Sequence, residues 1–240
     1  RRTRPVTASA AIRQAALNIC FTDRDAEGVA KLVEPGRLGI LPPFADFSGL
    51  NAVRQHDEVG GKVELLAIAM MLKGKKLESF RLLAEGLRLL KSANWQLTIV
   101  GDGPVRDAVE GMFNGFDQVR FAGQMDRAGV AGYLANSDVL VWPGYHEAFG
   151  LAYLEAQGAG LPVIAMRSGG VEAVVMDGNT GLLVEEGNAV QFADAVDELI
   201  ENSNMRKSMG EQAQAFARAE RGLATASARL DKLLHTAVKT

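Results

Sequence analysis

Short apolar runs alternate along the chain with longer segments in which apolar residues recur at helical spacing. Runs bounded by Gly, Pro, Asn or Asp predict strands, and the periodic segments predict helices. Strands are expected at residues 18–22, 37–41, 63–71, 95–100, 119–122, 138–142, 161–166 and 181–184. Helices are expected at residues 9–17, 25–32, 77–90, 130–134, 149–158, 171–175, 188–203 and 205–238, and a further helix with Pro104 at its first position. Because strands and helices alternate through short connections, the pattern predicts a doubly wound, parallel α/β sheet with right-handed crossovers.

The pattern divides the chain into two unequal parts. Residues 1–50 hold one α/β unit and little more, and they include the start of a linker. Residues 47–61 are rich in Ser, Asn, Gln, His, Asp and Gly, which is the composition of a linker. Residues 51–240 then carry the longer strand–helix alternation. We therefore expect a partial first domain at 1–50 and a Rossmann-like domain at 51–240.

The most informative stretch runs from Val141 to Ala156, where a buried strand ends at Pro-Gly and a helix follows. Unpaired backbone N–H groups at the start of a helix, together with the helix dipole, favour an anion. Gly150 has no side chain and lets a ligand approach the backbone. Glu147 and Glu155 flank this point. Phosphate on the amides and sugar hydroxyls on the carboxylates is the arrangement that a sugar nucleotide needs.

These residues resemble the E-x7-E signature of retaining glycosyltransferases of the GT-B fold, family 4 (group 1). Glu147 and Glu155 are separated by seven residues, with Phe149-Gly150 between them. Further matches follow in family order: Leu41-Pro42-Pro43-Phe44-Ala45-Asp46, Gly101-Asp102-Gly103-Pro104, Phe121-Ala122-Gly123-Gln124, Gly169-Gly170 and Asp177–Gly181. The resemblance covers residues 37–215, and it implies the C-terminal, donor-binding domain of such an enzyme with a remnant of the N-terminal domain.

The resemblance also implies roles for particular residues. It assigns Glu147 to catalysis, at the hydroxyls of the transferred sugar. It assigns donor binding to Lys73, Lys76, Gly101, Gly103, Phe121, Phe149, Gly150, Leu151 and Glu155. Several of these residues also have a purely structural interpretation. The 101–104 segment is typical of a structural turn, the lysines are typical of a solvent-exposed face, and Phe121 is typical of a side chain packed into the core. His146 is interpreted as incidental.

The sequence departs from the family at two places. The position of a family Arg that grips the donor diphosphate falls on Met71 or Leu72, so that Lys73 is an imperfect substitute. In the segment after Gly169-Gly170, Glu172 stands where the family has Pro, and Ala173 stands where it has Glu. Either Lys73 substitutes imperfectly for the Arg or diphosphate binding is weakened, and both departures support the alternative of a degenerate binding module.

Composition narrows the functional classes. The net charge of −3, with both signs interspersed, does not suggest a nucleic-acid or anionic-membrane surface. The single cysteine, Cys20, leaves no internal disulfide, and no apolar run approaches the ~20 residues of a membrane helix. We expect a cytoplasmic protein with no metal and no cofactor, and with at most peripheral membrane contact through a missing domain. Because the chain opens at Arg1 without Met, we expect a fragment or a processed chain.

The sequence therefore predicts a retaining hexosyltransferase that takes its sugar from a UDP-, GDP- or ADP-sugar, with this chain as the donor-binding part. The acceptor is unknown, and the isolated chain is expected to transfer poorly. Two alternatives stay open: a degenerate sugar-nucleotide-binding or interaction module without transfer activity, and a GT-B sugar-nucleotide epimerase. A nicotinamide-dependent enzyme is disfavoured because Arg106 stands where the third glycine of a dinucleotide fingerprint is required.

Overall fold

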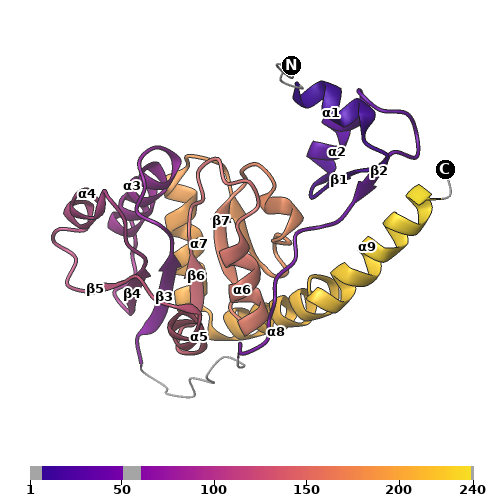
Figure 1. Cartoon of the computed structure of the whole chain (residues 1–240). Helices are drawn as coiled ribbons and strands as arrows, with labels where there is room; N and C mark the ends of the chain where they lie inside the picture. Colours follow the sequence, from indigo (N-terminus) through magenta and orange to yellow (C-terminus); the bar gives the residue numbers. More distant parts are fainter. Residues whose placement is uncertain (1–6, 51–60, 239–240) are drawn as a thin grey trace.

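The computed structural model describes residues 7–50 and 61–238, and within them two parallel sheets are formed (Figure 1). The large sheet has the strand order β5-β4-β3-β6-β7-β8. Its strands are β3 (Val63–Ile68), β4 (Trp95–Val100), β5 (Val119–Gly123), β6 (Val139–Val141), β7 (Val163–Met166) and β8 (Gly181–Val184). The small sheet pairs β1 (Asn18–Cys20) with β2 (Leu38–Ile40). The expected doubly wound parallel sheet is confirmed.

Helices connect consecutive strands of both sheets. The α-helices are α1 (Ala8–Gln14), α2 (Asp23–Ala30), α3 (Lys75–Arg88), α4 (Arg106–Met112), α5 (Arg127–Ala135), α6 (Leu151–Ala159), α7 (Ala189–Glu201), α8 (Ser203–Glu220) and α9 (Leu223–Val238). A 3-10 turn, η1 (Val171–Ala173), replaces the short helix expected at 171–175. Most boundaries fall within two residues of the expected ones, because apolar runs and caps mark the elements.

The core of the large sheet lies around β3, β6 and β7. All three residues of β6 and all four of β7 are buried, as expected of central parallel strands covered on both faces. Phe80 of α3 packs edge-on against Trp142, with ring centroids 4.8 Å apart. Gly86 gives α3 a close approach to α7, because a Cβ there would lie 2.9 Å from the Phe192 ring. The contact between Phe80 and Trp142 thus fixes α3 to the end of β6.

Two helix boundaries differ from the expectation for tertiary reasons. The helix expected at 205–238 is broken into α8 and α9, because Gly222 forms a parallel bridge with Ala45 and the Arg221 carbonyl accepts the Ala45 N–H at 3.0 Å. Helix α4 begins at Arg106 rather than Pro104, because the Val105 N–H donates to the Met71 carbonyl at 3.3 Å and leaves the helical path.

The N-terminal unit (residues 7–41) contacts the rest of the chain at two places. The rings of Phe21 and Phe149 lie 5.7 Å apart. At the other end of the unit, a Cβ at Gly39 would meet the Leu233 side chain at 2.6 Å, so that α9 packs directly on β2 (Figure 1). The last helix therefore lies beside the N-terminal unit rather than within the large domain. Residues 51–60 of the expected linker lie outside the described residues.

Candidate functional site

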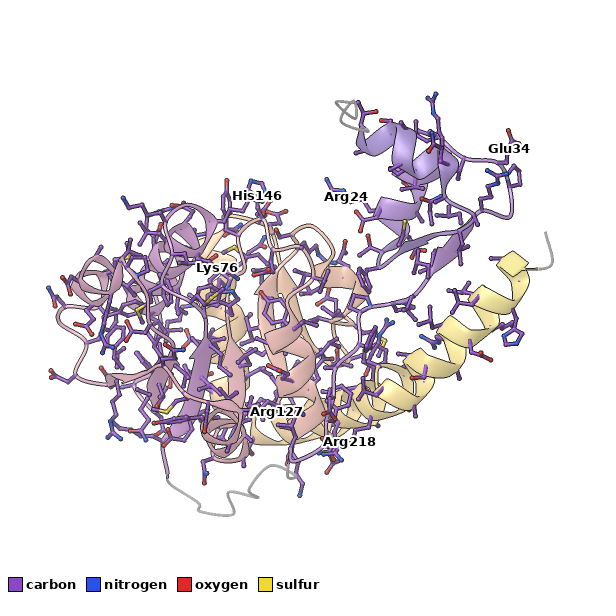
Figure 2. All side chains as sticks on the ribbon, in the orientation of Figure 1. Arg24, Glu34, Lys76, Arg127, His146 and Arg218 are labelled. Atoms are coloured by element: carbon purple, nitrogen blue, oxygen red, sulfur yellow. The ribbon has the colours of Figure 1, made fainter. Side chains whose placement is uncertain are left out.

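All six strands of the large sheet are parallel, so that the segments following them lie at one carboxyl edge. Strand β3 lies between β4 and β6, and the chain winds outward from it in both directions. In open α/β sheets, ligands bind beyond the carboxyl ends of the strands where the strand order reverses. That point lies here between the segment after β3 and the segment after β6. Lys76 and His146 mark it in Figure 2.

The segment after β6, residues 144–150, is called the glutamate loop below. The Lys76 ammonium and the Glu147 carboxylate form an ion pair across the switch point, with Nζ–Oε2 at 2.5 Å. The side chains are 30% and 18% exposed, so that the pair is largely shielded from water. The same ammonium lies 5.7 Å from the centroid of the Trp142 ring, within the range of a cation–π contact. The structure thus brings together the predicted phosphate-binding lysine and the predicted catalytic glutamate.

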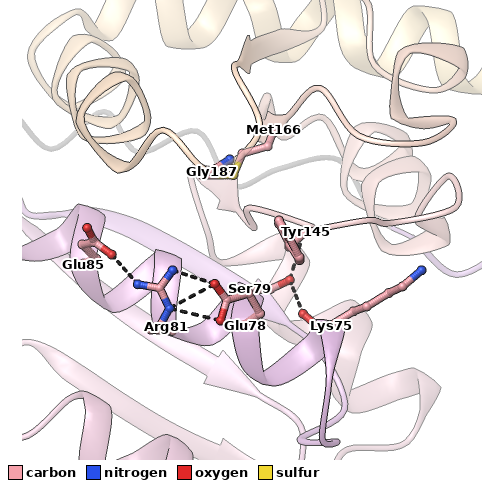
Figure 3. Close-up of polar contacts among 8 residues, drawn as sticks. All are labelled: Lys75, Glu78, Ser79, Arg81, Glu85, Tyr145, Met166 and Gly187. Carbon is pink, nitrogen blue, oxygen red and sulfur yellow. Dashed lines mark hydrogen bonds and ion pairs between the residues drawn. The ribbon is translucent and has the colours of Figure 1, made fainter.

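Helix α3 holds the start of the glutamate loop. The Tyr145 N–H donates to Ser79 Oγ at 2.9 Å, and this hydroxyl donates to the Lys75 carbonyl, also at 2.9 Å (Figure 3). Lys75 Nζ donates to the His146 carbonyl at 3.4 Å. The segment after β7 presses on the loop from the other side, where a Cβ at Gly169 would lie 2.0 Å from the Glu147 carbonyl oxygen. The loop is therefore held by protein contacts on both sides.

Tyr153 forms the floor beneath the glutamate loop. Its side chain is fully buried, and its hydroxyl donates to the Trp142 carbonyl at 3.1 Å. Burial, and secondarily the charge of Glu147, raise the pKa of this hydroxyl well above its ordinary value, so that it stays neutral. A Cβ at Gly144 or Gly150 would meet the Tyr153 side chain at 2.0 or 2.6 Å. Glycine is required at both positions because the loop lies directly on the ring.

Helix α6 begins at Leu151, with Gly150 as its N-cap in the left-handed region at φ 69°. No side chain caps this end, and no acidic residue lies in the first turn. The donors of the first turn are therefore not satisfied by a side chain, as an anion site requires. The expected helix start at Phe149 is corrected by two residues, because only glycine adopts the turn at 150 without strain.

Glu155 lies in the second turn of α6. Within the part of the chain that the structure describes, its carboxylate has no hydrogen bond and no ion pair. Burial raises the pKa of Glu155 above its ordinary value, and the charge of Arg127 partly opposes this. Arg127 itself binds Asp46 Oδ2 at 2.8 Å and the Ser48 carbonyl at 3.2 Å. A half-buried carboxylate without a partner is an acceptor available to a ligand.

Gly101 and Gly103 follow β4 and pass close to the end of β3. A Cβ would lie 1.9 Å from the Ala69 carbonyl oxygen at Gly101 and 2.3 Å from that of Met71 at Gly103. The Gly103 N–H donates to Asp102 Oδ1 at 2.7 Å, and Arg106 binds the other oxygen of that carboxylate at 3.0 Å. The turn thus uses one of its own amides internally, which favours the structural interpretation for Gly103.

The remaining predicted residues are dispersed. Phe121 is half-buried and packs edge-on against Phe113, with ring centroids 5.7 Å apart, so that it turns inward as the structural interpretation expects. Lys73 is exposed in the segment after β3, as are Met70 and Leu72. Met71 is fully buried. The family's Arg position therefore offers no basic side chain here, whether it falls on Met71 or on Leu72.

Sequence reasoning missed three residues that shape the site. Ser79 and Tyr153 have no motif of their own, although Tyr153 lies three residues after the N-cap glycine. Glu186 contacts His146, which sequence reasoning treated as incidental: Glu186 Oε1 accepts the His146 N–H at 2.8 Å. His146 has φ 50°, and it is the single non-glycine residue with positive φ in the ranges 7–50 and 61–238. No sequence signal marks that conformation.

The described residues contain no group of three or more His, Cys, Asp or Glu side chains placed to hold a metal ion. None of their helices combines the length and the apolar character needed to cross a membrane.

Comparison with known proteins connects this geometry to a family. The family model described as glycosyl transferases group 1 matches residues 51–216. A D-inositol 3-phosphate glycosyltransferase of Arthrobacter sp. (strain FB24) is 43% identical over 88 residues, which cover 37% of this chain and 21% of the relative. Among the first curated relatives, the matched segment spans between 17% and 37% of the relative's own length.

Solved structures show the same fold. HepE of Anabaena, in complex with UDP-glucose, aligns with a TM-score of 0.78 at 20% identity over 95% of this chain and 65% of its own. The C-terminal domain of LpcC, a glycosyl transferase group 1 family protein of Francisella tularensis, aligns with a TM-score of 0.62 at 24% identity. That alignment covers 75% of this chain and 99% of the domain. The chain has the architecture of these GT-B proteins.

Proposed function

Because the chain belongs to the glycosyl transferases group 1 family, we propose that it binds a nucleotide-diphosphate sugar and serves the retaining transfer of that sugar to an acceptor hydroxyl. The observation that carries the proposal is the Lys76–Glu147 pair at the switch point, beside the uncapped start of α6. The Lys76 ammonium at the start of α3 faces the Glu147 carboxylate of the glutamate loop, and the uncapped amides of α6 follow that loop directly. These are the groups that a diphosphate and a sugar require.

Each part of the donor has a candidate partner. The diphosphate is placed on the amides that begin α6 and on Lys76, which supply positive charge without a metal ion. Glu155 accepts hydrogen bonds from the ribose, since its carboxylate is half-buried and has no partner among the described residues. Glu147 accepts hydrogen bonds from the transferred sugar. HepE in complex with UDP-glucose and LpcC's C-terminal domain support a nucleotide-sugar donor and a donor-binding part, respectively.

The positive charge of Lys76 and of the α6 amides favours departure of the diphosphate. The bond between the anomeric carbon and the diphosphate oxygen breaks, and its electron pair leaves with the diphosphate towards Lys76 and the α6 amides. The acceptor oxygen bonds to the anomeric carbon on the same face. Its proton passes to the departing diphosphate, which is the nearest base on that face. Glu147 stabilises positive charge that develops on the sugar ring.

We propose that this chain supplies the donor-binding part, and that the small N-terminal sheet is the end of the domain that binds the acceptor. The location expected from the sequence, the cytoplasm, stays a prediction. So does the choice among UDP-, GDP- and ADP-sugars.

Isothermal titration with UDP, GDP, ADP and their glucose or mannose esters tests the proposal. One base is expected to bind, and Lys76→Met is expected to weaken that nucleotide about tenfold because a charge-assisted contact is lost. Lys91→Met is the matched control: Lys91 also forms an ion pair, with Asp194 at 2.8 Å, but beyond the opposite end of α3. Its binding should equal the wild type.

The outcome separates the proposal from its alternatives. Binding of no nucleotide by the wild type would refute donor binding. Equal binding by Lys76→Met and the wild type would favour a degenerate module whose switch point holds no phosphate. Release of an epimerised sugar in place of transfer would assign the site to an epimerase.

A further inference from the structure

His146 is held in a conformation that its side chain disfavours. Its φ of 50° lies in the left-handed region, where the Cβ of an L-residue crowds the backbone. The residue directly precedes Glu147, so that its backbone angles set the direction in which the Glu147 side chain leaves the loop. Relaxation of His146 to negative φ would turn Glu147 away from Lys76. Some contact must therefore hold His146.

The Glu186 carboxylate is that contact. Its Oε1 accepts the His146 N–H at 2.8 Å and lies 3.3 Å from Nδ1 of the same residue. One oxygen thus restrains both the backbone and the ring. Burial acts to raise the pKa of Glu186, but the nearby Ser168 hydroxyl and the hydrogen bond from the His146 N–H outweigh it and lower this pKa. Glu186 is therefore ionised at neutral pH.

Glu186 itself stands on a fixed base. It lies in the turn between β8 and α7, where the Gly187 N–H donates to Met166 Sδ at 3.2 Å (Figure 3). Asn188 caps α7 by accepting the Gln191 N–H at 3.0 Å. The contact between Glu186 and His146 therefore joins the glutamate loop to the segments that follow β7 and β8.

The glycine segment that follows β7 also touches the loop. Ser168 precedes Gly169 and Gly170. The Gly170 N–H donates to the Ala148 carbonyl at 2.6 Å. The loop is thus held on both sides of Glu147, by Glu186 at His146 and by Gly170 at Ala148.

We propose that Glu186 is a positioning residue that holds His146 in the left-handed conformation and thereby aims Glu147 at the sugar of the donor. This role rests on the proposed function, because the proposed function places the transferred sugar on Glu147. The proposed function places the phosphates on Lys76 and the α6 amides, not on Glu186. Loss of Glu186 should therefore weaken the contribution of the sugar without weakening the contribution of the nucleotide.

The test compares two affinities in four single variants of the full chain. For Glu186→Ala, we expect the Kd of the best-binding sugar nucleotide to rise about tenfold, while the Kd of its nucleoside diphosphate does not rise. Glu186→Gln keeps an acceptor oxygen and should fall between Glu186→Ala and the wild type. Glu185→Ala is the matched control, because among the described residues the Glu185 side chain accepts only from Asn188 Nδ2, at 3.3 Å. His146→Gly is measured as the reference for the rescue.

The rescue distinguishes positioning from general damage. Glycine adopts positive φ without strain, so that Glu186→Ala should cost less than threefold when it is combined with His146→Gly. An equal cost in both backgrounds, or an equal loss of both affinities, would overturn the proposal. So would full affinity for the sugar nucleotide in Glu186→Ala.

A ligand-free measurement keeps this proposal separate from the proposed function. Hydrogen exchange of the amides at 146–148 should accelerate in Glu186→Ala and not in Glu185→Ala. If the wild type binds no nucleotide while this exchange pattern holds, the proposed function fails and the restraint of the loop stands. Unchanged exchange in Glu186→Ala would refute the restraint in either case.

Discussion

Glu155→Gln is expected to stabilise the chain at neutral pH and at the same time to weaken donor binding. The wild-type carboxylate is half-buried and has no hydrogen bond or ion pair within the described residues, so that folding removes water from a charge and returns no contact. A neutral amide of the same shape avoids most of that cost. Opposite signs for stability and binding are the mark of a residue kept for its ligand.

The pH dependence of the stability change follows from the pKa of Glu155. Burial raises this pKa above its ordinary value of 4.5. A carboxyl group with a raised pKa contributes its full stability below the unfolded-state value and loses it as the pH rises through the folded-state value. The advantage of Glu155→Gln should therefore be present near pH 7 and vanish at and below pH 4.5.

The expected gain is modest because part of the carboxylate still meets water and Arg127 offsets part of the cost. We expect about 0.5–1 kcal/mol, a rise in Tm of roughly 2–3 °C for a chain of this length. The expected loss in affinity is larger. Glutamine keeps one acceptor oxygen, so that the loss is the difference between a charged and a neutral hydrogen bond, about 1–1.5 kcal/mol, which corresponds to a Kd for the sugar nucleotide roughly 5- to 10-fold higher.

Thermal denaturation at two pH values and isothermal titration measure the two effects. Glu211→Gln, on the exposed face of α8, is the matched control and should change neither quantity. A lower Tm for Glu155→Gln near pH 7 would show that the carboxylate has a structural partner. Unchanged affinity for every sugar nucleotide that the wild type binds would remove Glu155 from the donor site.

Three further substitutions test how the site is held. Gly169→Ala should lower the free energy of unfolding by more than about 2 kcal/mol, because its Cβ would lie 2.0 Å from a carbonyl oxygen of the glutamate loop. Gly178 also has positive φ but lies in open space, so that Gly178→Ala should lower the free energy of unfolding by less in the same denaturant titration. Tyr153→Phe leaves the buried Trp142 carbonyl without its donor and should lower the free energy of unfolding by about 1–2 kcal/mol, as measured by thermal denaturation. An unchanged stability would show that this hydrogen bond does not support the glutamate loop. Phe21→Ala removes the ring contact between the N-terminal unit and the glutamate loop, and should raise the susceptibility of residues 7–41 to limited proteolysis while leaving the Tm of the large sheet within roughly 2 °C.

The strands of the large sheet could be predicted from the sequence because each is a short, mainly apolar run, and β4, β5 and β6 end within two residues of a Gly or Pro. Burial on both faces of a parallel sheet leaves that signal clear. The edge that carries the site was predictable for the same reason, since parallel strands bring their following segments together. What could not be predicted is which side chains meet there. Lys76 and Glu147 are 71 residues apart, and only the order of β3 and β6 places them in contact.

The failures have tertiary causes. The apolar spacing of the last helix continues through Gly222, and only the bridge to Ala45 breaks it. The left-handed angle of His146 depends on Glu186, which belongs to a different connection of the sheet. In both cases a distant backbone or carboxylate decides a local conformation that propensity alone would assign otherwise.

The Lys76–Glu147 ion pair has a consequence for how a donor is discriminated. Lys76 already satisfies its charge on Glu147, so that a diphosphate must compete with a shielded ion pair. A nucleoside diphosphate that takes Lys76 leaves Glu147 largely buried and unpaired. A nucleotide sugar takes Lys76 and returns hydrogen bonds from sugar hydroxyls to the same carboxylate. On the proposed function, the pair therefore favours the substrate over the product that it becomes after transfer, and product release is assisted when Glu147 recovers Lys76.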